Sequence, residues 1–230
     1  MPLAARLPRS RDLQELVALA LPVISVQLGM MAMGVVDTIM VGHLSPTALA
    51  AVALGNVYYF GASIFGMGAL MALDPVVAQA VGANDREGIA RGVQRGMVLA
   101  LLLCIPTALV LLPAPLVLGW LRQPPEVAPL AGAYAQVCIP GTIGVFAFVV
   151  LRQSLQALGR MRAILITIVV ANLLNAGLNW LFIFGHGGFP AMGGATSFLI
   201  KDAVLLAGSI MLLKNGLLQV TDHCPKPQAS

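Results

Sequence analysis

Residues 96–119 read GMVLALLLCIPTALVLLPAPLVLG and contain no charged side chain. A helix crosses the hydrocarbon core of a bilayer with about 20 apolar residues, so this stretch is long enough to span a membrane. Similar, nearly charge-free runs recur along the chain. The predicted spans cover residues 16–40, 50–73, 96–119, 131–151, 163–184 and 196–213.

The composition of the whole chain agrees with these segments. Apolar residues make up 59% and charged residues 10%, and the mean hydropathy is +0.91. Soluble domains are roughly 45–50% apolar and about 25% charged, so this chain has too few charges to cover a soluble surface. The apolar runs are continuous rather than alternating, which favours helices over barrel strands. We therefore expect an all-α integral membrane protein, a bundle of six transmembrane helices.

The positions of Lys and Arg predict the topology. One set of loops and both termini hold Arg6, Arg9, Arg11, Arg86, Arg91, Arg95, Arg152, Arg160, Arg162, Lys214 and Lys226, and the opposite set holds only Arg122. The positive-inside rule then places both termini in the cytoplasm. We expect the protein to lie in the inner or plasma membrane of the cell. We expect a lead-in over residues 1–12, a transmembrane lobe over 13–214 and a cytoplasmic tail over 215–230.

Enzyme and metal chemistry are not indicated. The three cysteines and three histidines have no paired or metal-type spacing, and the chain contains neither an HExxH nor a GxSxG motif. The basic residues are scattered over short loops, so no nucleic-acid surface is expected. We predict a protein that is not an enzyme and that has no metal site and no cofactor.

Asp37 lies near the outer end of the first predicted span. A carboxylate in a membrane span is costly and usually faces the bundle interior or a water-filled cavity. The alternative is an interfacial residue that faces water at the helix end. The sequence leaves both open.

The fifth predicted span carries three amides, Asn172, Asn175 and Asn179. Asn175 and Asn179 are four residues apart, so they share a helix face. The amides could form hydrogen bonds between helices, or they could belong to a cation or proton site. At 1.5 Å per residue, Asp37 and Asn179 lie at similar depths, ~8 and ~9 Å from the outer loops. Tyr134 in the fourth span lies at a comparable depth, so all four residues could converge.

Other polar residues favour structural roles. Asp74 precedes Pro75 near the inner end of the second span, where an aspartate is a normal helix cap. Asn84 or Asp85 could cap the third helix. Lys201 and Asp202 are adjacent in the sixth span, and sequence neighbours on a helix do not face each other, so they make a poor ion pair.

Several motifs, in order, resemble one transporter family. The stretch LALPVISVQLGMMAMGVVDTIMVGHLSPTALAAVALG at 19–55 is similar to the opening of the multidrug and toxic compound extrusion (MATE) transporters. ALDPVVAQAVGANDREG at 72–88 is similar to their second helix and first cytoplasmic loop. LRQSLQALGRMR at 151–162 and NLLNAGLNWLFIFG at 172–185 are similar to their fourth and fifth helices. The resemblance covers about residues 13–194.

The resemblance implies an efflux antiporter that exchanges Na⁺ or H⁺ for organic cations and other amphipathic drugs. It implies two six-helix lobes around a central cavity, with this chain as the N-terminal lobe. The family's first-helix carboxylate serves cation or proton coupling, and Asp37 matches it within VDT. Asn175 and Asn179 match polar positions of the fifth helix, and Tyr134 is a weaker match. Some members have an acidic residue where this chain has Asn179.

Two departures from the family keep a second hypothesis open. The chain is about half the family's length, and the sequence from Phe198 onward does not follow the usual sixth helix. The implied partners are amphipathic drug-like substrates, the lipid bilayer, and a second lobe or a second copy of this chain. The alternative is a truncated, non-transporting remnant or a regulatory membrane partner.

Overall fold

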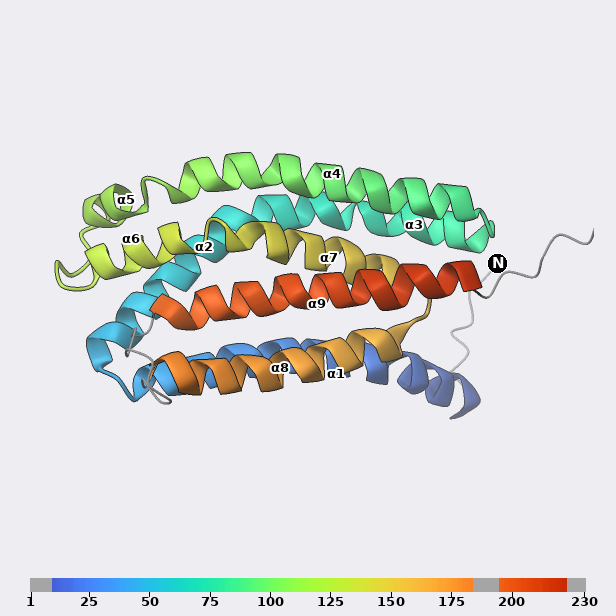
Figure 1. The fold of residues 1–230 in the computed structure, drawn as a ribbon, viewed down its shortest axis with the longest axis horizontal. Helices are drawn as coiled ribbons and strands as arrows, with labels where there is room; N and C mark the ends of the chain where they lie inside the picture. Colours follow the sequence, from blue (N-terminus) through green and yellow to red (C-terminus); the bar gives the residue numbers. More distant parts are fainter. Residues whose placement is uncertain (1–9, 184–194, 223–230) are drawn as a thin grey trace, which may run out of the picture.

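The computed structural model describes residues 10–183 and 195–222, and every element in these ranges is a helix (Figure 1). The helices are α1 Ser10–Gly42, α2 Pro46–Met71, α3 Leu73–Gly82, α4 Arg86–Leu111, α5 Ala114–Trp120, α6 Ala128–Val137, α7 Gly141–Ala157, α8 Met161–Ile183 and α9 Ala195–Asp222. Residues 185–194, which we expected to form an external Gly-rich loop, lie outside the described residues, as do residues 1–9 of the predicted lead-in and 223–230 of the predicted tail. The predicted all-α class is confirmed.

The helices form one bundle in which α9 packs against both α7 and α8, and α8 packs against α1. On the other side, α4 packs against α2, α3 and α7, while α6 packs against α2 and α5 (Figure 1). The core between α1, α4, α7, α8 and α9 is apolar. Its buried members are Val26, Val93, Phe148, Leu151, Leu155, Ile164, Ile168 and Leu212.

The outward faces of the helices are also apolar. Leu28, Phe65, Leu109 and Leu173 are between 61% and 76% exposed. Soluble monomers rarely expose contiguous apolar surface of this extent, because water drives such patches together. Lipid chains are the solvent that suits these faces.

Fewer apolar spans than the six predicted can be counted within the described residues. Within the described residues, four helical segments are long and apolar enough to cross a membrane, or five if the bent pair α6 and α7 counts as one span. The sixth predicted span lies in α9, where the described apolar part is only Ala203–Lys214.

Several predicted spans are pairs of helices rather than single rods. The second span continues past a break at Ala72 into α3, and the third begins already at Arg86 and continues past Pro113 into α5. The fourth bends by 57° between α6 and α7, next to Pro140. Proline has no N–H to donate and disturbs a continuous helix, which explains the last break.

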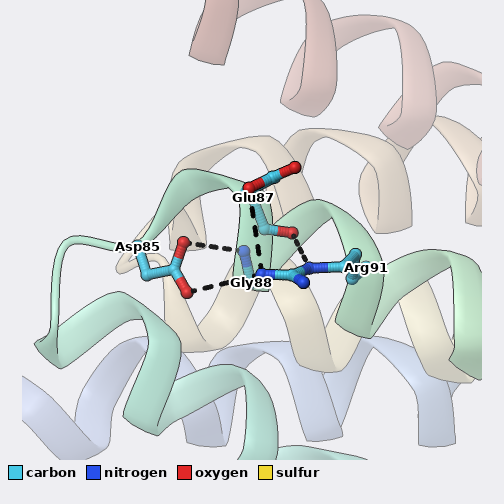
Figure 2. Close-up of polar contacts among 4 residues, drawn as sticks. All are labelled: Asp85, Glu87, Gly88 and Arg91. Atoms are coloured by element: carbon cyan, nitrogen blue, oxygen red, sulfur yellow. Dashed lines mark hydrogen bonds and ion pairs between the residues drawn. The ribbon is translucent and has the colours of Figure 1, made fainter.

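The turn between α3 and α4 confirms one predicted cap (Figure 2). Asn84 has a positive φ of 53°, and Asp85 Oδ1 accepts a hydrogen bond from the Gly88 backbone at 2.9 Å. Arg91 pairs with Glu87 and Asp85 at 3.9 and 4.0 Å. The polar stretch over residues 82–95, which we expected to be a cytoplasmic loop leading into an amphipathic start of the third helix, is mostly the first turns of α4, because Asp85 satisfies the helix start.

The prediction that Asp74 caps a helix is wrong. The N-cap position of α3 is Ala72, which has no side-chain oxygen, and Asp74 lies within the first turn. An acidic residue there still interacts favourably with the helix dipole. Arg152, predicted to lie between spans, is in fact a half-buried residue of α7.

Candidate functional site

A line of polar side chains runs between α1 and α8. Nearest the middle of α8, the Asn172 amide nitrogen donates to the Gly29 carbonyl of α1 and to the Ile168 carbonyl of its own helix, both at 2.9 Å. The helices approach closely here because Gly29 has no side chain, and a Cβ on it would collide with Ile168. Asn172 therefore forms a hydrogen bond between helices, which is one of the two roles that the sequence left open for the three amides.

Asp37 lies farther along the same interface. Its side chain is 0% exposed, so the alternative that it faces water does not hold. The Asn179 amide nitrogen donates to Asp37 Oδ1 at 2.6 Å and to Asn175 Oδ1 at 3.3 Å. Asn175 and Asn179 are also 0% exposed. The structure thus brings Asp37, Asn175 and Asn179 into one buried cluster, which we call the Asp37 cluster, while their role in coupling stays a prediction.

The Asp37 cluster keeps unused hydrogen-bonding capacity. Within the described residues, Asp37 Oδ2, Asn179 Oδ1 and Asn175 Nδ2 are buried and have no hydrogen-bond partner. Leaving a buried polar atom unsatisfied costs about 1–3 kcal/mol. Two of these atoms are oxygens, the ligand type that hard cations prefer, and the carboxylate oxygen can also take a proton. The arrangement is suited to hold a small cation or a proton between two helices.

Tyr134 of α6 is buried near this cluster. It packs with Val41 and Ile183, which lie one helical turn beyond Asp37 and Asn179 respectively. Its ring also lies against Gly55 of α2, where a Cβ would collide with the ring. The structure thus places the fourth predicted residue in the next layer outward along α1 and α8.

Lys201 of α9 is a residue that the sequence reasoning missed. Ile200 and Val204 pack in one cluster with Met33 and Ala171, which lie one turn before Asp37 and Asn175. The Lys201 ammonium is near enough to attract the Asp37 carboxylate electrostatically. The signal in the sequence was a charged pair inside an apolar run, and only the packing of α9 against α1 and α8 shows that Lys201 influences Asp37.

A second polar group lies between α3 and α7. Asp74 is exposed, and Arg152 of α7 attracts it electrostatically. Beside Arg152, Gln153 is 5% exposed, and neither of its amide atoms has a hydrogen-bond partner within the described residues. Among all the residues that the structure describes, no group of three His, Cys, Asp or Glu side chains could hold a metal ion.

An apolar exterior, bilayer-length helices and a buried carboxylate with two amides inside the bundle define a multi-pass α-helical membrane protein. Comparison with known proteins then identifies the family. The MatE family profile matches residues 22–181, and the chain belongs to this family.

Named relatives agree. The "Probable multidrug resistance protein NorM" of Rhizobium meliloti (strain 1021) is 38% identical over 195 residues, which cover 85% of this chain and 42% of the relative. The "Multidrug resistance protein MdtK" of Cronobacter sakazakii is 38% identical over 184 residues, 80% of this chain and 40% of the relative. The relatives are transporters and not enzymes.

Solved structures share the fold. The crystal structure of the eukaryotic MATE transporter AtDTX14 superposes with a TM-score of 0.81 at 25% identity, covering 96% of this chain and 48% of that one. The outward-facing conformation of a multidrug resistance MATE transporter gives a TM-score of 0.76 at 22% identity, over 92% and 48% of the two chains. The chain therefore spans about half the length of its relatives and has the fold of one lobe, the N-terminal one.

Proposed function

We propose that this chain is one lobe of a multidrug efflux antiporter that exchanges Na⁺ or H⁺ for organic cations and other amphipathic drug-like molecules. The observation that carries the proposal is the Asp37 cluster, in which Asn179 donates to one carboxylate oxygen and the other has no hydrogen-bond partner among the described residues. The names of the NorM and MdtK relatives support multidrug resistance as the process.

The proposed chemistry follows from the position of the charge. An ionised carboxylate that is 0% exposed in an apolar bundle must be neutralised by a proton or a cation. Asn179 and Asn175 orient the carboxylate and offer amide oxygens to a bound ion. Binding and release of that ion change the charge between α1 and α8, and this change would bias which side of the membrane the transporter opens to.

In the proposed site, the Lys201 ammonium competes with the coupling ion for the Asp37 carboxylate. Its ammonium attracts the same carboxylate that the coupling ion would occupy. An entering Na⁺ must therefore reduce the Asp37–Lys201 attraction. The coupling ion would bind more weakly here than at an Asp37 cluster without a nearby ammonium.

The proposed topology has both termini in the cytoplasm. The turn between α3 and α4, the connection between α7 and α8 and the start of α1 lie at one end of the bundle (Figure 1). Arg86, Arg160 and Arg162 belong to or adjoin these connections. The positive-inside rule supports a cytoplasmic position for this end. Asp37, near the opposite end of α1, would then lie in the outer half of the membrane.

The test is dye efflux from membrane vesicles that contain this chain, under an imposed Na⁺ or H⁺ gradient. We expect gradient-driven efflux of a fluorescent lipophilic cation, and its loss in Asp37→Asn. Asp85→Asn is the matched control, because it makes the same chemical change at an exposed cap that asparagine also forms well. Efflux by Asp37→Asn at the level of the unmodified chain would contradict the proposed coupling site.

One outcome would favour the alternative function. If the chain is inserted and folded but no variant supports efflux, the chain does not transport by itself. That result would favour the alternative, a non-transporting remnant or a regulatory membrane partner.

A further inference from the structure

The Asp37 cluster lies between two unbroken helices. α1 runs from Ser10 to Gly42 and α8 from Met161 to Ile183, so each helix continues on both sides of the cluster. In a continuous helix the backbone carbonyls accept the helix's own hydrogen bonds. Na⁺ sites in transporters commonly use carbonyls of unwound helix segments, and the helices pass this cluster without such a segment. The side chains therefore have to hold the coupling ion.

These side chains offer few free oxygen atoms. Asp37 Oδ2 and Asn179 Oδ1 have no hydrogen-bond partner among the described residues, whereas Asp37 Oδ1 and Asn175 Oδ1 already accept from the Asn179 amide nitrogen. Hard metal ions such as Mg²⁺ and Ca²⁺ take about six oxygen ligands or more. The third unpartnered atom of the cluster is Asn175 Nδ2, an N–H donor whose hydrogens repel a cation. The set of donor atoms is therefore a poor fit to a metal ion.

The cluster also lacks room for a metal ion. Asp37, Asn175 and Asn179 are all 0% exposed, so no space of the size of a water molecule adjoins these side chains. A metal ion would have to push α1 and α8 apart, and a close-packed interior resists such insertion. A proton needs no space of this kind.

The two free oxygens are complementary around one proton. The Asn179 amide nitrogen donates to Asp37 Oδ1 at 2.6 Å, which is one of the two hydrogen bonds that a carboxylic acid and an amide can share. A proton on Asp37 Oδ2 makes that oxygen a donor, and Asn179 Oδ1, on the same amide group, is a free acceptor. One proton thus satisfies both oxygens and leaves the carboxyl group neutral in its apolar surroundings.

The charged and titratable groups around Asp37 come from several helices. Among the described residues, Lys201 of α9 is the charge that acts on Asp37, and α8 contributes only amides to the cluster. The phenols of Tyr59 in α2 and Tyr134 in α6 pack in the next layer outward, and His43 at the end of α1 is exposed. A proton on Asp37 therefore ends its attraction to Lys201, which changes the electrostatic contact between α1 and α9.

We propose that the Asp37 cluster binds H⁺ and excludes Na⁺, with the proton on Asp37 Oδ2 and in a hydrogen bond to Asn179 Oδ1. One O–H bond forms on loading and breaks on release, and the proton comes from and returns to water on the side to which the site opens. The inference rests on the proposed function, because it names the coupling ion of the same site.

Infrared difference spectra of the purified chain between alkaline and acidic pH test the proposal. We expect the C=O band of a protonated carboxylic acid that shifts in D₂O and is missing in Asp37→Asn. Asp85→Asn, at an exposed carboxylate, is the matched control and should keep the band. Replacing K⁺ by Na⁺ at constant ionic strength should change neither the band nor the pH at which it appears. Suppression of the band by Na⁺ but not by K⁺ would overturn the proposal.

A variant of the acceptor tests the position of the proton. Asn179→Leu removes the amide and keeps a side chain of similar size, so the C=O band should move to higher frequency because the acid O–H loses its acceptor. Asn172→Leu is the control on the same helix, outside the cluster, and should leave the band in place. If Asn179→Leu does not fold, Asn179→Ala removes the same acceptor. An unchanged band frequency in the folded variant would place the proton elsewhere and overturn the assignment.

Efflux of a fluorescent lipophilic cation separates this inference from the proposed function. An imposed H⁺ gradient should drive efflux, and a Na⁺ gradient alone should not. If a Na⁺ gradient alone drives efflux that Asp37→Asn loses, the proton assignment is overturned while the proposed coupling site stands. If Asp37→Asn transports as well as the unmodified chain, the proposed coupling site fails, and the infrared spectra still decide whether the cluster binds a proton or Na⁺.

Discussion

Asp37 and Asp74 are both aspartates at the ends of apolar stretches, yet their surroundings differ. Asp37 is 0% exposed between α1 and α8, and Asn179 holds one of its oxygens. Asp74 is exposed on α3, with Arg152 of α7 as its nearby opposite charge. Both residues lie near the end of a predicted span, so depth along the span does not explain why their surroundings differ. The neighbouring helix explains the difference, because α8 provides amides beside Asp37 and α7 provides a cation beside Asp74.

The strongest test of this contrast removes the amide that holds Asp37. We expect Asn179→Ala to weaken binding of the coupling ion about 10- to 100-fold, the usual effect of losing a group that orients a metal ligand. Thermal midpoints measured against Na⁺ concentration, and separately against pH without Na⁺, report this loss through linkage. Asn172→Ala is the control on the same helix, because Asn172 bonds to backbone carbonyls only. An equal loss of ion dependence in both variants would show that α8 packing, not the amide, is responsible.

A second test separates α1 from α8. Gly29→Val places side-chain atoms where Ile168 already lies, and overpacking of this kind costs about 1–3 kcal/mol. We expect a lower thermal midpoint and weaker ion dependence, because the Asp37 cluster needs both helices in contact. Gly34→Val is the control on the same helix, since a Cβ at Gly34 meets nothing within 4 Å. A midpoint for Gly29→Val that equals that of Gly34→Val would show that close approach at Gly29 is dispensable.

Removing the ammonium near Asp37 should have a smaller effect of the opposite sign. Lys201→Met keeps the length of the side chain and removes its charge, so we expect the coupling ion to bind up to about tenfold more tightly, or about 1.4 kcal/mol. Lys214→Met, at an exposed position of the same helix, is the control. Weaker ion binding in Lys201→Met would mean that Lys201 supports the cluster rather than competing for it.

The smallest effect is expected at the other aspartate. Asp74→Asn removes the charge that attracts Arg152, but exposed ion pairs contribute only about 0–1 kcal/mol. The thermal midpoint should change little, and the ion dependence of that midpoint should not change. A loss of ion dependence in Asp74→Asn would abolish the distinction between the two carboxylates.

Patterns within one helix could be predicted from the sequence. Asp85 was recognisable as a cap by its position before a helix, and Asn175 and Asn179 share a face because they are four residues apart. Counting residues from the helix ends placed Asp37 at a similar depth to Asn179, since the first and fifth predicted helices run in the same direction. These inferences depend only on helix geometry, which is the same in every protein.

Contacts between helices could not be predicted in this way. The separate role of Asn172 depends on the closeness of Gly29, and the effect of Lys201 depends on how α9 packs against α1 and α8. The position of Arg152 inside α7 was also missed. Each depends on residues far apart in the sequence, and hydropathy along one helix carries no information about them.

The bend between α6 and α7 has a mechanical consequence. α6 packs against α2 and α5, whereas α7 packs against α3, α4 and α9, and Pro140 lies between them. The broken span therefore has a short arm, α6, and a long arm, α7, which meet at a bend over residues 138–140. Its short arm carries Tyr134, which contacts the turn of α1 and α8 just beyond Asp37 and Asn179. A displacement of α1 or α8 beside Asp37 and Asn179 would therefore reach α6 through Tyr134, on the other side of the bend from α7.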